Sequence, residues 1–397
     1  MDFKLIGSIL LIVGTSLGAG MLALPIVTAQ LGFLGAVALL VGCWFLLTAG
    51  AFLILEVNLW FSHHSNMITM AKKTIGPLGQ IIAWVTYLLL LYSLLCAYIA
   101  GGTDLLSHLT HAAEFNIPFI VSAVLFTTFF GAIVWQGIRI VDYSNRLLMM
   151  IKFTAYFALV ALLLPFISIA PLMKFELTSV TSSAAIMVTI TSFGYAAIVP
   201  SLRVYFADDI QKLKIAILIG SLIPLVCYFF WDMVIMGVIP LGGSQGLNSI
   251  LSSTNPNSAL VNALISSTSQ APITFFIKLF ASICVVTSFL GVSLCLGDFL
   301  ADGLGVEKKG WPKVFVYLLT FAPPLLIVAV FPNAFLKALE YAGIYCVILL
   351  VFLPALMAYR GRYLKHYPQS FRVPGGKIGL LALMAISILL IIFAALT

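Results

Sequence analysis

The sequence predicts an all-α polytopic membrane protein. Its 397 residues are 62% hydrophobic and only 8% charged, and the mean hydropathy is +1.16. This composition is typical of proteins that cross the bilayer several times, and it excludes a soluble globular domain. A hydrocarbon core of about 30 Å requires roughly 20 apolar residues per helix. Eleven stretches of the chain meet that requirement, so membrane lipids are the expected surroundings.

The eleven predicted transmembrane helices follow one another through short connections. In chain order they cover residues 5–29, 33–60, 80–107, 117–137, 147–170, 184–206, 214–240, 271–300, 313–332, 336–358 and 378–396. The first is too long for a cleaved signal peptide, and a second span follows it directly. We therefore expect it to remain in the mature protein.

Lysine and arginine orient these helices. With the amino terminus in the cytoplasm, all 20 Lys and Arg except Lys174, Lys278 and Lys337 fall in cytoplasmic loops or at inner helix ends. Positive side chains are retained on the cytoplasmic side of membrane proteins, so the carboxyl terminus is expected on the opposite, periplasmic side. The net charge of +7 is thus a signal of topology and does not indicate a nucleic-acid partner.

Cysteine and histidine give no indication of a metal or another cofactor. All six cysteines fall within predicted spans and none forms a C-x-x-C pair, so neither a disulfide framework nor a zinc site is predicted. The stretch "HLTHAAE", from His108 to Glu114, has spacing that could place three ligands along one helical face. A solvated outer loop explains these residues equally well.

The first predicted span contains an unusual stretch, "GTSLGAGMLALP", from Gly14 to Pro25. Glycine lowers helix stability by roughly 1 kcal/mol relative to alanine, and proline removes a backbone donor. Gly14 and Gly18 have the G-x-x-x-G spacing of close helix packing, which is one interpretation. The other is an unwound segment whose free N–H and C=O groups face a cavity lined by protein.

A second copy of this pattern favours the unwound segment. The sixth span contains "TSFGYAAIVP", residues 191–200, in which Thr191, Ser192 and Gly194 repeat the spacing of Thr15, Ser16 and Gly18. The two breaks are five spans apart, and an odd number of spans inverts the second unit in the membrane. The sequence therefore predicts a transporter with a first repeat at 1–170, an inverted second repeat at 183–359 and one additional helix at 377–397.

Several segments resemble the bacterial hydroxy/aromatic amino acid permeases, and in particular the tyrosine permeases of that family. They are "GTSLGAGMLALP", Leu55-Glu56-Val57, "AYIAGG" at 97–102, "DYSNRLLMMIK" at 142–152, "TSFGY" with "VPS" at 191–201, and "TSFLGVSLCLGDFLAD" at 287–302. The resemblance implies a leucine-transporter-like fold with a five-plus-five inverted repeat. It also implies proton symport of tyrosine, tryptophan or phenylalanine across the bacterial inner membrane. This chain has Ala196 where family members often have histidine, so the preferred aromatic substrate stays open.

An amino acid substrate suits the two predicted breaks. Its carboxylate is expected to bind backbone N–H groups where the second half of span one begins, near Gly20. Its ammonium is expected to bind carbonyl oxygens that are left free where the preceding half-helices end. Apolar walls are expected to enclose its aromatic ring. The predicted substrate-binding residues are Thr15, Ser16, Gly18, Ala19, Gly20, Tyr92, Cys96, Thr191, Ser192, Phe193, Gly194 and Tyr195.

Lys152 is the predicted coupling residue, together with Thr287 and Ser288. One interpretation is that Lys152 extends back to the cytoplasmic surface from the inner part of span five. The other is that it points inward against span one and the Thr287-Ser288 pair. In leucine-transporter-like proteins this junction holds sodium, and some proton-driven relatives have a lysine ammonium there. The resemblance, which includes the lysine itself, favours the inward position and proton coupling.

The remaining acidic residues, the 241–270 segment and the alternative functions complete the predictions. Glu56 and Asp298, at the inner ends of spans two and eight, form a possible gate or pair with cations, whereas Asp104 and Asp232 are expected to be structural. Residues 241–270 suit either a lid or a flexible connector. A sodium-coupled neutral amino acid symporter is the alternative function. A membrane-embedded enzyme is remote, because no H-E-x-x-H or G-x-S-x-G motif is present.

Overall fold

The computed structural model describes residues 3–62, 65–112, 114, 117–173, 182–206, 209–368 and 371–396, and within these ranges every regular element is helical. Nine helical segments of this part are long and apolar enough to cross a membrane. The chain is therefore a polytopic membrane protein whose described part is all-helical. Two further apolar helices, Lys4–Ser16 and Phe119–Trp135, are shorter and lie where two of the eleven predicted spans were expected. Lys174, which entered the charge argument, is outside the described residues.

The elements follow the predicted order. The first half comprises α1 (Phe3–Ser16), α2 (Gly20–Thr28), η1 (Ala29–Leu31), α3 (Gly32–Leu59), α4 (Met67–Thr74), α5 (Pro77–Ala112), α6 (Phe119–Trp135), α7 (Ile138–Leu163), η2 (Leu164–Phe166) and α8 (Ile169–Leu172). The second half comprises α9 (Ser183–Ser192), η3 (Gly194–Ile198), α10 (Val199–Phe206), α11 (Ile210–Val238), α12 (Leu247–Leu251), α13 (Pro256–Thr268), α14 (Ala271–Leu304), α15 (Gly310–Val330), α16 (Ala334–Val347), η4 (Ile348–Phe352), α17 (Leu353–Tyr363) and α18 (Gly376–Leu396).

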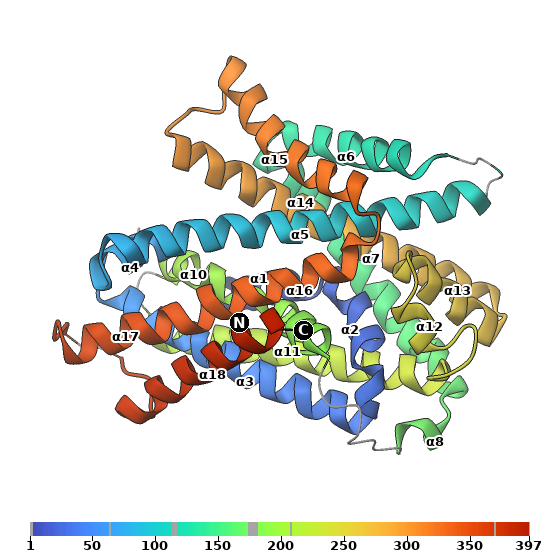
Figure 1. The fold of residues 1–397 in the computed structure, drawn as a ribbon, viewed down its shortest axis with the longest axis horizontal. Helices are drawn as coiled ribbons and strands as arrows, with labels where there is room; N and C mark the ends of the chain where they lie inside the picture. The colour runs from blue at the N-terminus through green and yellow to red at the C-terminus, as the bar shows by residue number, and fades with distance from the viewer. Residues whose placement is uncertain are drawn as a thin grey trace.

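The long helix α5 runs through the middle of the molecule (Figure 1). It packs against α14, α15 and α6 on one side and against α16 on the other. The helices α1, α3, α11, α17 and α18 lie on the α16 side in this view. Both interrupted helices belong to that second group, since α1 packs on α11 and α2 packs on α9.

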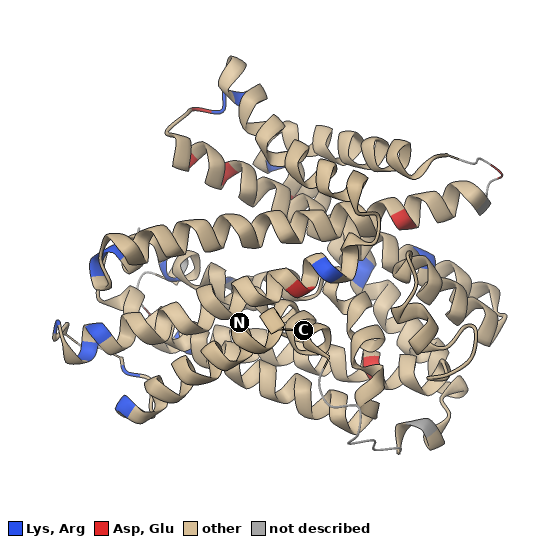
Figure 2. Cartoon of the chain, viewed as in Figure 1, with Lys and Arg blue, Asp and Glu red and all other residues tan. Residues whose placement is uncertain are grey.

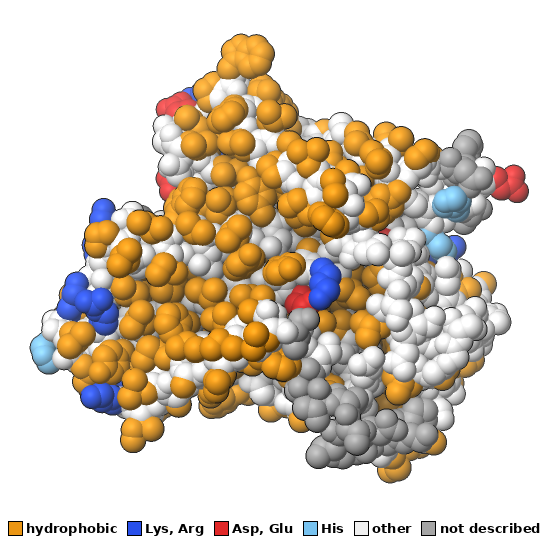
Figure 3. Space-filling model, in the orientation of Figure 1, with side chains coloured by type: hydrophobic (Ala, Val, Ile, Leu, Met, Phe, Trp, Pro, Cys, Tyr) orange, Lys and Arg blue, Asp and Glu red, His pale blue; other side chains and the backbone are white. Residues whose placement is uncertain are grey.

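Charge and hydrophobicity are unevenly distributed over the surface. Most Lys and Arg gather at the end of the molecule where α4, α17 and the start of α18 lie, whereas few lie near α12 and α13 (Figure 2). Hydrophobic side chains cover much of the face between these ends (Figure 3). Large apolar side chains such as Phe45, Phe129 and Ile378 are strongly exposed on the surface of the molecule. Such a surface is stable in lipid and would be costly in water.

Helices α1 and α9 end within the two predicted breaks. α1 ends at Ser16, and α2 starts at Gly20 with tight three-residue turns, Met21 N to Gly18 O (3.1 Å) and Leu22 N to Ala19 O (3.1 Å). α9 ends at Ser192, and the 3₁₀ segment η3 separates it from α10. Both breaks were predicted from the glycine and Thr-Ser patterns.

A third irregularity was not predicted. The π-helical segment η4 lies between α16 and α17, beside Gly50 of α3. A Cβ on Gly50 would be only 2.0 Å from the Leu350 carbonyl oxygen, so glycine is required for this approach. A π-helical turn widens the helix by one residue, and it leaves no signature in an apolar run such as "ILLVF".

The long loop at 241–270 contains the two short helices α12 and α13, and α13 is fixed to α5. Asp104 of α5 accepts hydrogen bonds from the backbone N–H groups of Asn257 and Ser258 (3.0 and 3.1 Å) and from the Ser258 hydroxyl. His108 contacts Asn262 at 2.7 Å. Asp104 thus acts as the N-cap of a helix that is distant in sequence. The loop is docked on α5 rather than a loose connector.

We expect Asp104→Ala to loosen α13 without unfolding the protein. Loss of an N-cap costs ~1 kcal/mol, which corresponds to an increase of about fivefold in local opening. Hydrogen exchange of the amides at 256–268 measures this directly. The matched control is Asp209→Ala, because Asp209 caps α11 through Lys212 N (3.1 Å) and should leave α13 exchange unchanged. Unaltered exchange of α13 in Asp104→Ala would contradict the capping role.

Candidate functional site

The two helix breaks lie side by side and share one hydrogen-bond donor. The hydroxyl of Tyr228 on α11 lies 2.6 Å from Ser16 O and 2.9 Å from Ser192 O, the carbonyls at the ends of α1 and α9. Tyr228 is fully buried. Carbonyls at a helix end lack an intrahelical partner, and a single hydroxyl proton can satisfy only part of their demand. The paired breaks therefore present acceptor oxygens that are incompletely satisfied by the protein.

Polar side chains line the first break on the α14 side. Ser288 Oγ accepts a hydrogen bond from Ala19 N (3.0 Å) and donates its own proton to Cys284 O (2.8 Å). Ser16 Oγ is buried and has no hydrogen-bond partner among the described residues. Buried hydroxyls are normally paired, so an unpaired one at a helix break is available to a ligand. Thr15 is less available, since its hydroxyl bonds back to its own helix at Ile12 O (2.8 Å).

Lys152 lies at the junction of α1, α7 and α14. Its Nζ lies 2.5 Å from Leu17 O and 3.3 Å from Thr287 Oγ1, and the side chain is only 2% exposed. Thr287 Oγ1 donates to Ile283 O (2.8 Å), so it offers a lone pair to the ammonium. The side chain thus points into the protein and not back to the surface. The ammonium lies within contact of both oxygens.

At the second break, the side-chain hydroxyls already donate to backbone carbonyl oxygens. Thr191 donates to Met187 O or Leu339 O (both 2.9 Å), and Ser192 donates to Val188 O (2.9 Å). These hydroxyls satisfy helix carbonyls and are therefore occupied. Gly194 faces Cys346, whose Sγ would lie 3.3 Å from an added Cβ.

Two aromatic side chains of the second break point into the core. Phe193 packs edge-on against Tyr228 with ring centroids 5.3 Å apart. Tyr195 shares a hydrogen bond of 3.0 Å with Thr48 of α3. Both side chains are almost completely buried. They form a buried aromatic surface beside the break, and edge-to-face rings of this kind are favourable contacts.

The two predicted residues of α5, Tyr92 and Cys96, lie on the face of this helix that contacts α15. The Tyr92 hydroxyl donates to Leu319 O (2.8 Å) and Cys96 Sγ lies 3.9 Å from Pro324 O, so both contact α15. Tyr98 is instead buried on the side of α5 near Ser288 of α14. Because α5 is packed on both sides, its apolar residues alone do not show which face meets the breaks.

Sequence reasoning missed Tyr98 and Tyr228. A weak signal for Tyr228 existed, because it lies one helical turn before Asp232 in an otherwise apolar span, and two polar groups at this spacing share one helix face. Nothing in the sequence related that face to Ser16 and Ser192.

The predicted inner acids form two pairs of different character. Glu56 receives two hydrogen bonds from Arg362, Nε to Oε1 at 2.6 Å and Nη2 to Oε2 at 2.5 Å, and both side chains are buried. Val373 N donates to the same carboxylate (2.7 Å). Asp298 pairs with Lys308 and remains more than half exposed. An exposed pair of this kind contributes little to stability, whereas a buried bidentate pair is costly to break.

Gly18 and Gly20 have features of both interpretations of the first span, namely an unwound segment and close helix packing. Each lies in the first break, and each also meets a hydroxyl: an added Cβ would lie 2.3 Å from Ser288 Oγ at Gly18 and 2.9 Å from Ser192 Oγ at Gly20. The glycines therefore permit both the irregular backbone and the close approach of the neighbouring helices.

We expect Gly20→Ala to destabilise the protein, by about 1–3 kcal/mol if the added methyl overpacks the interface. Ser192→Ala in the same chain should restore most of the loss, because Ser192 Cβ lies 3.7 Å from the new methyl, an ordinary contact. Thermal unfolding in detergent measures both variants. Gly7→Ala, where nothing lies within 4 Å, is the control that should cause no loss. Equal melting temperatures for Gly20→Ala and the wild type would show that this contact is not tight.

Comparison with known proteins places the chain in a family. The model of the tryptophan/tyrosine permease family matches residues 1–394. The chain is 33% identical over 391 residues to the tyrosine-specific transport system 1 of Haemophilus influenzae, which covers 98% of this chain and 95% of that protein. It is 30% identical over 378 residues to the tryptophan-specific transport protein of Shigella flexneri, covering 94% and 90% of the two chains.

A third relative is named for a substrate outside the aromatic class. The chain is 32% identical over 405 residues to glutamine transporter 2 of Aliivibrio fischeri, covering 99% of both chains. All three relatives are named as transport proteins, and the match to each extends over nearly the whole chain. With the family model matching from the first residue through the last long helix, the chain belongs to the tryptophan/tyrosine permease family.

Proposed function

We propose that this chain imports aromatic amino acids, tyrosine in preference, across the bacterial inner membrane by proton symport with alternating access. The observation that carries the proposal is the contact of the two breaks, whose terminal carbonyls Ser16 O and Ser192 O share the Tyr228 hydroxyl. Discontinuous helices that meet in this way bind substrate in inverted-repeat transporters. Relatives of this chain are named for tyrosine and tryptophan transport.

The proposed architecture has eleven spans, in which α1 with α2 and α9 with α10 are the two discontinuous helices. We propose repeats at 1–170 and 183–359 related by inversion, with α18 as the additional helix. The amino terminus is cytoplasmic and the carboxyl terminus periplasmic in this proposal. The concentration of Lys and Arg beyond α4 and α17 supports that orientation (Figure 2).

The proposed substrate site lies between the two breaks. The amino acid carboxylate binds near Gly18, Ala19 and Gly20, where α2 begins and the helix dipole is positive. The ammonium binds Ser16 O and Ser192 O, and Ser16 Oγ supplies a further hydrogen bond. The aromatic ring packs beside Phe193 and Tyr195, with Tyr98 in place of Tyr92 and Cys96 on the α5 side. Support comes from the unpaired Ser16 hydroxyl and from the burial of the two aromatic side chains.

The proposed coupling residue is Lys152. Water that enters the open site keeps the ammonium charged, and closure of the site removes water and favours the neutral amine. The proton then leaves toward the cytoplasm when the inner path opens. The exposed Asp298–Lys308 pair is the part of the inner mouth that can separate at small cost, and Glu56–Arg362 is its fixed part.

A competition experiment tests the substrate and the driving ion together. Purified protein in liposomes takes up labelled tyrosine under an imposed inward proton gradient, and each of the twenty amino acids competes in turn. We expect tyrosine, tryptophan and phenylalanine to compete most strongly and uptake to be unchanged when choline replaces sodium. Strong competition by glutamine alone would favour the activity named for the Aliivibrio relative. Uptake that requires sodium would favour the sodium-coupled alternative.

A further inference from the structure

Asp232 of α11 is a buried carboxyl group for which the coupling scheme above has no role. Its side chain is fully buried, and Oδ1 has no hydrogen-bond partner among the described residues. Within the same part of the chain, the hydrogen-bonding contact of Oδ2 is with Thr28 Oγ1, at 3.5 Å. Removing a carboxylate from water without compensating hydrogen bonds or a cation is very costly, and such groups become neutral instead. The surroundings of Asp232 therefore disfavour its charged form.

The hydrogen bonding of Thr28 identifies which partner carries the proton. Thr28 Oγ1 lies 2.7 Å from Leu24 O of its own helix, and a hydroxyl has only one proton to donate. That proton is committed to the nearer oxygen, so Thr28 offers Asp232 a lone pair. An ionised carboxylate would then face this lone pair, which is repulsive. A neutral carboxyl can instead direct its own proton toward Thr28, so this arrangement favours the protonated form of Asp232.

The elements packed around α11 provide no cation for Asp232. Helices α2, α8, α9, α13 and η2 carry no ionisable side chain. Helix α14, whose Phe280 packs against Trp231 of α11, carries Lys278, Cys284, Cys295, Asp298 and Asp302. The described ionisable side chains on α1, α3, α7 and α10 are Lys4, Cys43, Glu56, Arg139, Asp142, Tyr143, Arg146, Lys152, Tyr156 and Arg203. Among the described residues none of these forms an ion pair with Asp232, and Tyr228, one turn back on α11, directs its hydroxyl to Ser16 O and Ser192 O instead. Lys152 is engaged elsewhere, with Leu17 O.

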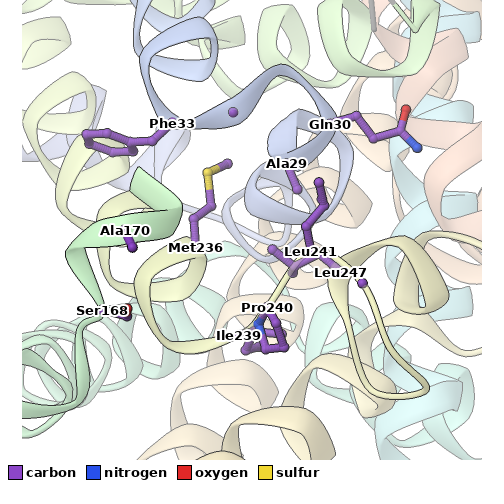
Figure 4. A pocket seen from close by; sticks show the side chains of 12 residues that line it. Ala29, Gln30, Phe33, Ser168, Ala170, Met236, Ile239, Pro240, Leu241 and Leu247 are labelled. Carbon is purple, nitrogen blue, oxygen red and sulfur yellow. The ribbon is translucent and has the colours of Figure 1, made fainter. Parts of the chain in front are cut away.

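A cavity begins one helical turn beyond this carboxyl. It has a volume of about 420 Å³ and is lined by residues of η1, the start of α3, α8, the end of α11 and the segment that follows α11. Ala29 and Met236 lie on its wall (Figure 4). Ala29 follows Thr28 directly, and Met236 lies four residues after Asp232 on the same face of α11. A proton carried by water in this cavity has only one turn of helix to pass before it meets the Asp232–Thr28 pair.

We propose that Asp232 is a second proton-binding site, neutral in this conformation and loaded from the cavity at the outer ends of α2 and α11. The role of Asp232 in transport rests on the proposed function. In that role, Asp232 binds a second proton, and the position of α2 determines when this proton is released. α2 carries both Thr28 and the start of the substrate break at Gly20. A shift of α2 away from α11 would separate Thr28 from Asp232 and admit water, which stabilises the carboxylate and releases the proton.

Infrared difference spectroscopy tests the protonation state without transport. Wild-type protein in lipid nanodiscs at pH 7 should show the carbonyl-stretch band of a neutral carboxylic acid. Asp232→Asn should lose that band, Asp232→Glu should shift it, and Asp209→Asn, which removes an exposed acid at the start of the same helix, should retain it. Absence of the band in the wild type, or its persistence in Asp232→Asn, would overturn the proposal. A band that sodium removes at constant pH would overturn it in favour of a cation site.

Access through the cavity has its own measurement. Transfer to D₂O shifts the neutral-acid band as the proton exchanges, and Met236→Phe, which narrows the cavity, should slow this shift several-fold. Met233→Phe is the matched control, because Met233 lies on the same helix but does not line the cavity. Equal slowing by both variants, or by neither, would overturn loading through the cavity.

The transport role is separable from the proposed function. Asp232→Asn resembles the neutral acid, so it should keep tyrosine binding while uptake loses part of its stimulation by acid pH. Wild-type pH dependence in Asp232→Asn would overturn the transport role of Asp232. If wild-type uptake proved independent of protons while the neutral-acid band was present, the proposed function would fail and the proton site would remain.

Discussion

A Lys152→Ala protein is expected to lose proton-driven accumulation of tyrosine while it keeps exchange of internal for external tyrosine. Exchange requires no net proton movement, whereas accumulation requires a group that binds and releases a proton in each cycle. Lys152→Arg should fail in the same way, because a guanidinium retains its charge at any relevant pH. Labelled tyrosine in proteoliposomes measures both, with and without an imposed proton gradient.

The location of Lys152 makes this test sharp. Its ammonium contacts Leu17 O and Thr287 Oγ1 at only 2% exposure, so removal of the side chain deprives both oxygens of this cation. The control is Lys309→Ala, which removes a lysine that is 85% exposed and whose partner Glu307 is exposed too, and which should leave accumulation unchanged. A Lys152→Arg protein that concentrates tyrosine with normal proton dependence would end this mechanism.

The second large effect is expected at the buried ion pair. Arg362→Met should destabilise the protein by about 3–5 kcal/mol, because it leaves the Glu56 carboxylate buried without its cation. The double variant Glu56→Gln, Arg362→Met should recover most of the loss, since both charges are then absent. Thermal or denaturant unfolding in detergent measures the three proteins.

The neighbouring Arg360 provides the control for this series. It lies on the same helix and donates to Ile75 O (3.1 Å), but it has no acidic partner among the described residues, so Arg360→Met should cost much less. If Arg362→Met were as stable as Arg360→Met, or if the double variant were no better than Arg362→Met, the pair would not be a structural anchor.

The membrane class and the helix breaks could be read from the sequence because lipid imposes strict local requirements. Spans must be long and apolar, and any break in their backbone bonding requires compensation. The repeated Thr-Ser-x-Gly patterns at 15–18 and 191–194 therefore identified both breaks, and the structure ends α1 and α9 there. The family was likewise recognised from motifs distributed along the whole chain, and the family match confirms it.

Helix rotation could not be read in the same way. A soluble helix shows its buried face by hydrophobicity, but a membrane helix is apolar toward both lipid and protein. For this reason the sequence left Lys152 with two directions and favoured Tyr92 over Tyr98. Packing of α7 against α14 and of α5 against α14 and α16 decides these orientations.

By itself, the sequence determined that this chain is a polytopic permease with two interrupted helices, because those properties depend on local composition and backbone chemistry. Tertiary structure alone decided which polar groups meet: Glu56 with Arg362 across 306 positions, Tyr228 with both breaks, and Asp232 with Thr28. Each of these contacts joins helices far apart in the chain. In a medium that offers no water to buried polar groups, their partners are set by the packing of the helices that carry them.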